Sequence, residues 1–270
     1  MKFRICNLYP VTVAEGEGVG TAYEYFAKRR LLRTVFAGVN PRTILIAGLP
    51  EQYGTSADTV LLGHSAGARV TIMDEREEAL ARQRKALAQY GPPAGVPADA
   101  VESVKVTGLT NLNAGRAPYD LVISCDVMQR LAPEERMAYL LQAARLGRQA
   151  LIFFPNDHNT SKVNKSAKKG IDRDELVAAL RAANCRVMRS GYVDMPPFPS
   201  GKKLAQAKQA EIGQSWWRNL AFAVLEAWSL AERIVPESIR RKYSHAGYVH
   251  YLQELNRQAA GEGKDKATPR

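Results

Sequence analysis

Two stretches of the chain place a glycine turn and an acid where apolar runs end. "ILIAG" ends at Gly48 and continues into Leu49 and Pro50, whereas "RVTIMDE" ends at Asp74 and Glu75. A glycine lets backbone approach a ligand closely, and an acid at the end of the next strand can accept hydrogen bonds from ribose hydroxyls. The pair predicts a nucleoside-binding crevice; the alternative for the acids is a solvated charge that caps the following helix.

A second glycine-bearing turn competes for the same role. "AEGEGVGTAYEYF" carries Gly16, Gly18 and Gly20 directly before a predicted helix, which is typical of a loop that cradles phosphate groups. The apolar run before it is short, and the next predicted strand, "RTILIAG", has no acid at its end. We therefore favour a flexible entry loop here and expect the ligand at Gly48.

Two titratable residues are candidates for acid–base chemistry. Asp126 follows the apolar run "YDLVISC", and His158 follows "RQALIFFP". Ligands of open α/β sheets gather at the carboxyl ends of strands, so we predict that both lie near a reacting group. The alternatives are a helix cap for Asp126 and a surface residue for His158.

The elements that would position these residues alternate regularly. Seven strand-like segments are separated by helical ones, and the strands are expected at residues 42–48, 69–74, 101–109, 119–127, 148–155, 185–195 and 245–253. Strands alternating with helices predict a doubly wound α/β fold with a mostly parallel sheet. Pro133 and Asp172 mark two helix starts, and Thr21 with Glu24 forms a capping-box pattern at the head of an N-terminal helix.

This pattern divides the chain into five parts. Residues 1–40 form an N-terminal extension with a cap helix, 41–200 the cofactor-binding core, 201–243 a helical insertion or lid, 244–255 the last strand, and 256–270 a polar, disordered tail.

Several motifs together resemble the class I S-adenosylmethionine-dependent methyltransferases, a family with a Rossmann-like fold. The similar segments are "ILIAG", "RVTIMDE", "VKVTGLTNL", "YDLVISCDVMQRL", "RQALIFFPN" and "GYVDMPPFPSG", and the resemblance covers about residues 20–200. "YDLVISCDVMQRL" is the most specific of them. The glycine motif is degenerate, because Pro50 replaces a second glycine and Ile46 stands where the family usually has an acid.

The resemblance implies S-adenosyl-L-methionine as cofactor and assigns roles around it. Asp74 and Glu75 would hold the ribose, and Cys125 would lie near the transferred methyl group. The other implied contacts are Tyr23 and Tyr25 folding over the cofactor, Gly48, Leu49 and Pro50 in the turn, and Leu109, Thr110 and Asn111 beside the adenine.

The function expected from this resemblance is methyl transfer to a small, apolar or anionic acceptor. A nucleic-acid substrate is disfavoured, because the Asn/Asp-Pro-Pro-aromatic run that methylates exocyclic base amines is missing after the fourth strand. Two alternatives stay open. One is a catalytically inactive methyltransferase-like subunit that binds a partner protein through the helical insertion, and the other is an NAD-dependent oxidoreductase, although no G-x-G-x-x-G follows the first strand.

Two further segments suggest contacts. "SWWRNLAFAVLEAWSLAERIV" places Trp217, Leu220, Val224 and Trp228 at helical spacing, as expected for a lid, a homodimer contact or a peripheral membrane contact. In the loop after the fifth strand, four lysines could gather an anionic group or form a solvated charge run: Lys162, Lys165, Lys168 and Lys169.

The bulk composition is that of a basic globular protein. Against 27 acidic residues stand 38 Lys and Arg, which gives a net charge of +11 and favours anionic partners. Cys6, Cys125 and Cys185 are widely spaced and lack the spacing of metal ligands, so we expect free thiols in a reducing compartment. We find neither an export signal nor a membrane span in the sequence, and we expect a cytoplasmic location.

Overall fold

The computed structural model describes residues 4–14, 18–51, 56–92, 95–97, 100–112, 118–159, 171–195 and 216–254. Seven strands form one sheet: β1 (Thr43–Ala47), β2 (Arg69–Asp74), β3 (Val101–Lys105), β4 (Leu121–Cys125), β5 (Ala150–Pro155), β6 (Cys185–Val193) and β7 (Ala246–Gln253). Their order is β3-β2-β1-β4-β5-β7-β6, in which β7 alone runs antiparallel to its neighbours. The predicted doubly wound, mostly parallel sheet is confirmed.

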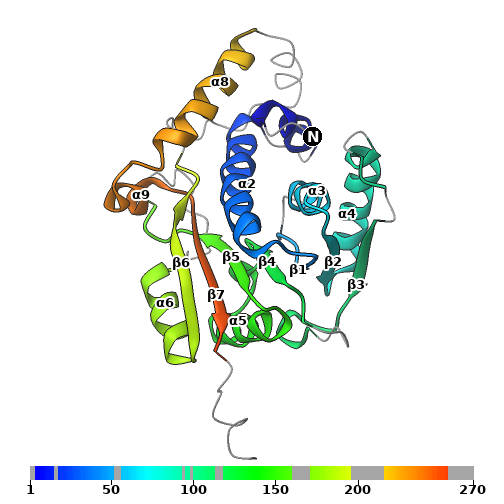
Figure 1. Cartoon of the computed structure of the whole chain (residues 1–270), viewed down its shortest axis with the longest axis vertical. Helices are drawn as coiled ribbons and strands as arrows, with labels where there is room; N and C mark the ends of the chain where they lie inside the picture. Colours follow the sequence, from blue (N-terminus) through cyan, green and yellow to red (C-terminus); the bar gives the residue numbers. More distant parts are fainter. Residues whose placement is uncertain are drawn as a thin grey trace, which may run out of the picture.

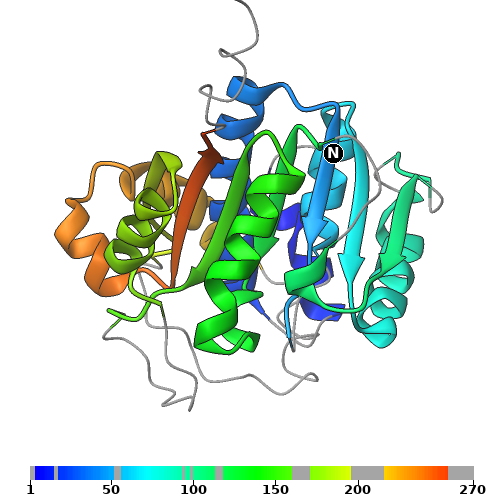
Figure 2. The same ribbon diagram turned by 90° about the horizontal axis from the view of Figure 1, so that it is seen from below.

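Helices cover both faces of this sheet (Figures 1 and 2). The described helices are α1 (Tyr9–Ala14), α2 (Val19–Val39), α3 (Ala57–Ser65), α4 (Glu77–Tyr90), α5 (Pro133–Leu146), α6 (Arg173–Ala182), α8 (Trp216–Ala231) and α9 (Glu237–Tyr243). Short 3-10 turns occur at η1 (Ile5–Asn7), η3 (Leu109–Asn111) and η4 (Met128–Arg130). The helices α2, α3 and α4 lie on one face, and α5 and α6 lie on the other.

The two-residue period of the strands distributes the apolar side chains between these layers. In β1, Ile44 and Ile46 belong to the core under α2, α3 and α4, whereas Leu45 and Ala47 belong to the core under α5 and α6. All four are buried. This explains why the central strands consist of continuous apolar runs instead of alternating ones.

Two of the three predicted helix starts are confirmed, and one is wrong. Pro133 is the first residue of α5, and the Asp172 carboxylate accepts hydrogen bonds from the backbone N–H groups of Asp174 and Glu175 at the start of α6, as predicted. The capping box expected at Thr21 and Glu24 is wrong. The helix α2 begins earlier, with Gly18 as its N-cap, and Glu24 instead pairs with Lys28 one turn further along.

The helices α8 and α9 lie between β6 and β7 in the chain, as predicted for the insertion. In Figure 1, α8 projects beyond the end of the sheet, next to α1 and α2. One face of α8 packs inward: Phe222 and Leu225 are buried, and the ring of Phe222 lies 5.4 Å from the ring of Tyr9. Large apolar side chains cover its other face and are exposed: Trp216, Trp217, Leu220, Val224 and Leu230.

Among the residues that the structure describes, no helix has the length and apolar composition that crossing a membrane requires.

Candidate active site

The turn after β1 lies where the strand order reverses between β1 and β4, the usual ligand position in such sheets. Gly48 has φ +82° and donates its N–H to the carbonyl oxygen of Met73 at 2.7 Å. A Cβ atom at this position would lie 3.0 Å from Val127 and 3.2 Å from Leu109. Glycine is therefore required both by its backbone angle and by close neighbours, and protein side chains already occupy the space over it.

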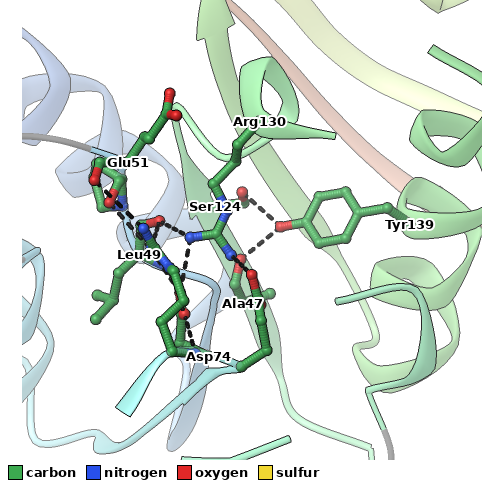
Figure 3. Close-up of polar contacts among 10 residues, drawn as sticks. Ala47, Leu49, Glu51, Asp74, Ser124, Arg130 and Tyr139 are labelled. Carbon is green, nitrogen blue, oxygen red and sulfur yellow. Dashed lines mark hydrogen bonds and ion pairs between the residues drawn. The ribbon is translucent and has the colours of Figure 1, made fainter. Parts of the chain in front are cut away.

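The Asp74 carboxylate lies at the centre of a buried hydrogen-bond network (Figure 3). It accepts bonds from the Leu49 N–H at 2.7 Å, from the backbone and guanidinium of Arg76 at 2.9 to 3.1 Å, and from Arg130 at 3.1 Å. Burial alone would raise the pKa of Asp74, but the hydrogen bonds from Arg76 and Leu49 and the charge of Arg130 outweigh it and lower that pKa.

Two arginines thus fill the crevice between β1 and β2. Arg130 comes from η4, has a side chain only 8% exposed, and also binds the Glu75 carboxylate at 2.5 Å and the Leu49 carbonyl at 2.8 Å. Arg76 donates to the carbonyl oxygens of Leu49 and Pro50. The carboxylate predicted to hold a ribose is therefore completely buried and bound by residues of the chain itself.

The floor beneath this network is rigid. The Tyr139 hydroxyl, from α5, forms hydrogen bonds of 2.6 Å with the Ala47 carbonyl and with the Ser124 hydroxyl, which joins the ends of β1 and β4 (Figure 3). All three residues are buried. The two strand ends that bracket the crevice are consequently held together from below.

A cavity of about 210 Å³ opens beside this crevice, at the ends of β1 and β4 and against α2. Its lining is strongly charged and includes Glu24, Lys28, Asp58 and Asp126, with Pro50 of the β1 turn and Cys125 of β4. The predicted catalytic residue Asp126 and the predicted cofactor residues Pro50 and Cys125 therefore face one cavity. Tyr25, also predicted to lie over the cofactor, lines it as well.

Lys28 organises the charges of this cavity. Its ammonium group is buried and lies 2.6 Å from both the Glu24 and the Asp126 carboxylates. Burial alone would lower the pKa of Lys28, but the negative charges of Asp126 and Glu24 reverse the effect and hold that pKa well above its ordinary value. Asp126 has φ +56°, a left-handed conformation that costs energy in a non-glycine residue, although Asp adopts it more readily than most.

Cys125 lines the cavity as a free thiol. Burial raises the pKa of its thiol far above the ordinary range, in spite of the nearby Lys28 charge. The thiolate is the reactive form of cysteine, so the neutral thiol acts here as an apolar lining group.

The remaining predicted residues lie apart from this cavity. Tyr23 is buried and donates its hydroxyl proton to Glu232 at 2.5 Å, and the His158 ring contacts Asp172 and Arg241, both at 2.7 Å. In η3, Leu109 is buried, Thr110 is half-buried and Asn111 is exposed. The lysines at 162, 165, 168 and 169 and the tail at 256–270 lie outside the described residues.

Sequence reasoning missed the residues that shape the site most strongly: Lys28, Arg76 and Arg130. One signal was available, because Glu24 and Lys28 are four residues apart on one helix, as in a stabilising ion pair. For Arg76 and Arg130 the sequence carried no comparable signal, since surface arginines commonly flank strand ends.

Comparison with known proteins rests on structure alone. No protein-family model matches the sequence, and no curated protein matches it. Among solved structures, the chain is similar to the methyltransferase domain of bacterial CtHen1-C, with a TM-score of 0.53 at 11% identity over 85% of this chain and 98% of that one.

Two further methyltransferase structures have a similar fold. The glycopeptide N-methyltransferase MtfA, solved with S-adenosyl-L-homocysteine, gives a TM-score of 0.51 at 10% identity over 84% of this chain and 89% of that one. An S-adenosylmethionine-dependent methyltransferase from Clostridium acetobutylicum gives 0.51 at 9% identity over 83% and 89%. The chain therefore has the fold of the class I S-adenosylmethionine-dependent methyltransferases. The strand order, with its antiparallel β7, is consistent with this likeness.

Proposed function

We propose that the protein is a methyltransferase that uses S-adenosyl-L-methionine and acts on a small, apolar or anionic acceptor in the cytoplasm. The observation that carries the proposal is the charged cavity at the ends of β1 and β4, under α2. The solved structures that support it are methyltransferases, and MtfA was solved with S-adenosyl-L-homocysteine.

The cavity suits one part of that cofactor. S-adenosylmethionine carries a cationic sulfonium and a zwitterionic amino-acid end, and when bound it would supply an electrophilic methyl group. The carboxylates of Asp58 and Asp126 can face its positive charges, and Lys28 can face its carboxylate. A volume of about 210 Å³ is below the roughly 300–1,000 Å³ of most small-molecule pockets, which fits the amino-acid end better than the whole molecule.

The ribose end does not fit the crevice as it stands. Ribose hydroxyls would need the Asp74 carboxylate, whose two oxygens already bind Arg76, Arg130 and the Leu49 N–H. For cofactor binding we therefore propose that Arg130 withdraws from Asp74 and keeps its ion pair with Glu75.

Within the cavity, the chain's own residues would perform positioning and proton transfer. Lys28 fixes the orientation of the Asp126 and Glu24 carboxylates through two short ion pairs. Burial raises the pKa of Glu24 in spite of Lys28, which makes that carboxyl a candidate to accept a proton from an acceptor group near neutral pH.

A second candidate function is favoured by the same network. If Arg76 and Arg130 bind Asp74 permanently, the chain keeps the methyltransferase fold but has lost its cofactor, and its role is not catalytic. Removing one partner from such a buried cluster leaves uncompensated charge, so the arginines resist displacement from Asp74.

Calorimetric titration separates these functions. We expect heat from S-adenosylmethionine and S-adenosylhomocysteine but none from NAD. Lys28→Gln should weaken binding of both by about 1.5–3 kcal/mol, the scale of a charge-assisted hydrogen bond, whereas Lys85→Gln on the exposed side of α4 should not. Absence of heat from both sulfur compounds, with folded protein verified by circular dichroism, would overturn the methyltransferase and favour the second function.

The exposed face of α8 supports a proposal about location within the cell. We propose that this face lies against an anionic membrane surface, because apolar residues cover it and the exposed basic residues Arg233 and Lys242 come after α8 in the chain. Such attachment would suit a lipid-like acceptor.

A further inference from the structure

A second cavity is separate from the candidate active site. It measures about 360 Å³ and lies on the other side of α2, between that helix, the end of α8, and strands β6 and β7. No residue lines both cavities. Its lining contains four arginines from four different elements or their ends: Arg30, Arg189, Arg233 and Arg240.

Among the described residues, the lining sets one acid against these four arginines. Glu232 is the one acid in this lining, and its carboxylate oxygens accept hydrogen bonds from the Tyr23 hydroxyl at 2.5 Å and the Met195 N–H at 3.1 Å. Among the described residues, neither Arg189 nor Arg233 has an ion-pair partner. Burial and the charge of Arg233 both lower the pKa of Arg30, as expected where cations crowd together.

Two polar groups of the lining residues also lack partners. Within the described part of the chain, the Arg240 Nε and the Tyr192 hydroxyl are buried and form no hydrogen bond. Protein atoms cover both groups, so they do not themselves face the cavity. The four arginines that line it call for an anion with several acceptor oxygens.

We propose that this cavity binds a small organic phosphate, with the phosphate group held by the arginines. A phosphate monoester carries up to two negative charges and three acceptor oxygens, which match several guanidinium groups better than a single carboxylate does. The cavity is larger than a phosphate needs, and Leu31, Val193 and Tyr248 give it apolar walls for an organic group. The proposal does not depend on methyl transfer.

The experiment uses the full chain and three soluble probes: inorganic phosphate, phenyl phosphate and phenol. By calorimetry at physiological ionic strength, we expect phenyl phosphate to bind more tightly than inorganic phosphate, and phenol not to bind. Arg189→Gln and Arg233→Gln, both at exposed positions, should each weaken phenyl phosphate binding about tenfold. Arg186→Gln is the matched control, because Arg186 is exposed on the same strand and does not line the cavity.

A second arm distinguishes a soluble ester from a lipid headgroup. Co-sedimentation with phosphatidylcholine vesicles, with and without phosphatidic acid, tests the lipid source. Binding that requires phosphatidic acid and is lost in Arg189→Gln supports the cavity with a lipid phosphate as ligand. The proposal is overturned if neither probe class binds, or if Arg186→Gln weakens binding as much as Arg189→Gln does.

Discussion

At the scale of single residues, the Asp74 carboxylate decides how the crevice can be used. An acid at the end of β2 is where a ribose ligand was predicted, yet here it is a structural group that joins the β1 turn, Arg76 and Arg130. The predicted ribose role and this unpredicted structural role both need an acid at this position, so the sequence could not separate them. The difference lies in the two arginine side chains, which approach from other segments.

Replacement of Asp74 by Asn tests this structural role. The variant removes the charge that two largely buried guanidinium groups share, and we expect the free energy of unfolding to fall by about 3–5 kcal/mol. Urea denaturation measures the change. Glu77→Gln serves as the control, because its ion pair with Arg84 is half exposed and should contribute less than about 1 kcal/mol. Equal stability of the wild type and Asp74→Asn would contradict the role.

At the scale of elements, α8 has two apolar faces of different character. Phe222 and Leu225 pack on the N-terminal helices, while Trp217, 62% exposed, lies among the apolar residues on the outer face. The sequence predicted the helix and its apolar stripe. It could not show which apolar residues would be covered, because almost the whole circumference of this helix is apolar.

The membrane proposal for α8 predicts different effects from its two faces. Trp217→Gln combined with Leu220→Gln should reduce binding to phosphatidylglycerol-containing vesicles at least tenfold, since each inserted side chain contributes about 1.5–3 kcal/mol, and should leave unfolding unchanged. Phe222→Ala should instead lower the free energy of unfolding by about 3–5 kcal/mol. Analytical ultracentrifugation tests the alternative. If the wild type is a dimer that the double variant disrupts, and neither binds vesicles, α8 contacts a second copy of the chain and the membrane proposal is contradicted.

At the scale of the whole molecule, stability should depend on pH because folding shifts the pKa values of two carboxyl groups in opposite directions. The pKa of Asp74 is lowered in the folded protein, so its stabilisation is present above about pH 4 and is lost in stronger acid. Burial raises the pKa of Glu232 to about 7, so the folded state binds a proton that the unfolded state releases above about pH 4.5. Stability should therefore decline as the pH rises toward neutrality.

Glu232→Gln isolates the second effect. The difference between about 7 and the ordinary 4.5 corresponds to about 3 kcal/mol, which wild type should lose between about pH 5 and about pH 8 relative to the variant. The pKa of Glu24 is raised in both proteins, so its contribution to the pH dependence of stability cancels in the comparison. Urea unfolding at the two pH values measures the difference. Parallel pH profiles would show that Glu232 ionises normally.

The sequence by itself determined the elements, their order and thus the fold, because the apolar periods of strands and helices and the caps at Pro133 and Asp172 are local properties. It also placed Pro50, Cys125 and Asp126 at the ends of the central strands, where all three line one cavity. Only the tertiary structure decided that Arg130 reaches Asp74, that Lys28 lies between Glu24 and Asp126, and that four arginines meet across α2, β6 and the α8–α9 region. Long side chains from segments far apart in the sequence make these contacts, and their direction depends on packing that no local pattern records.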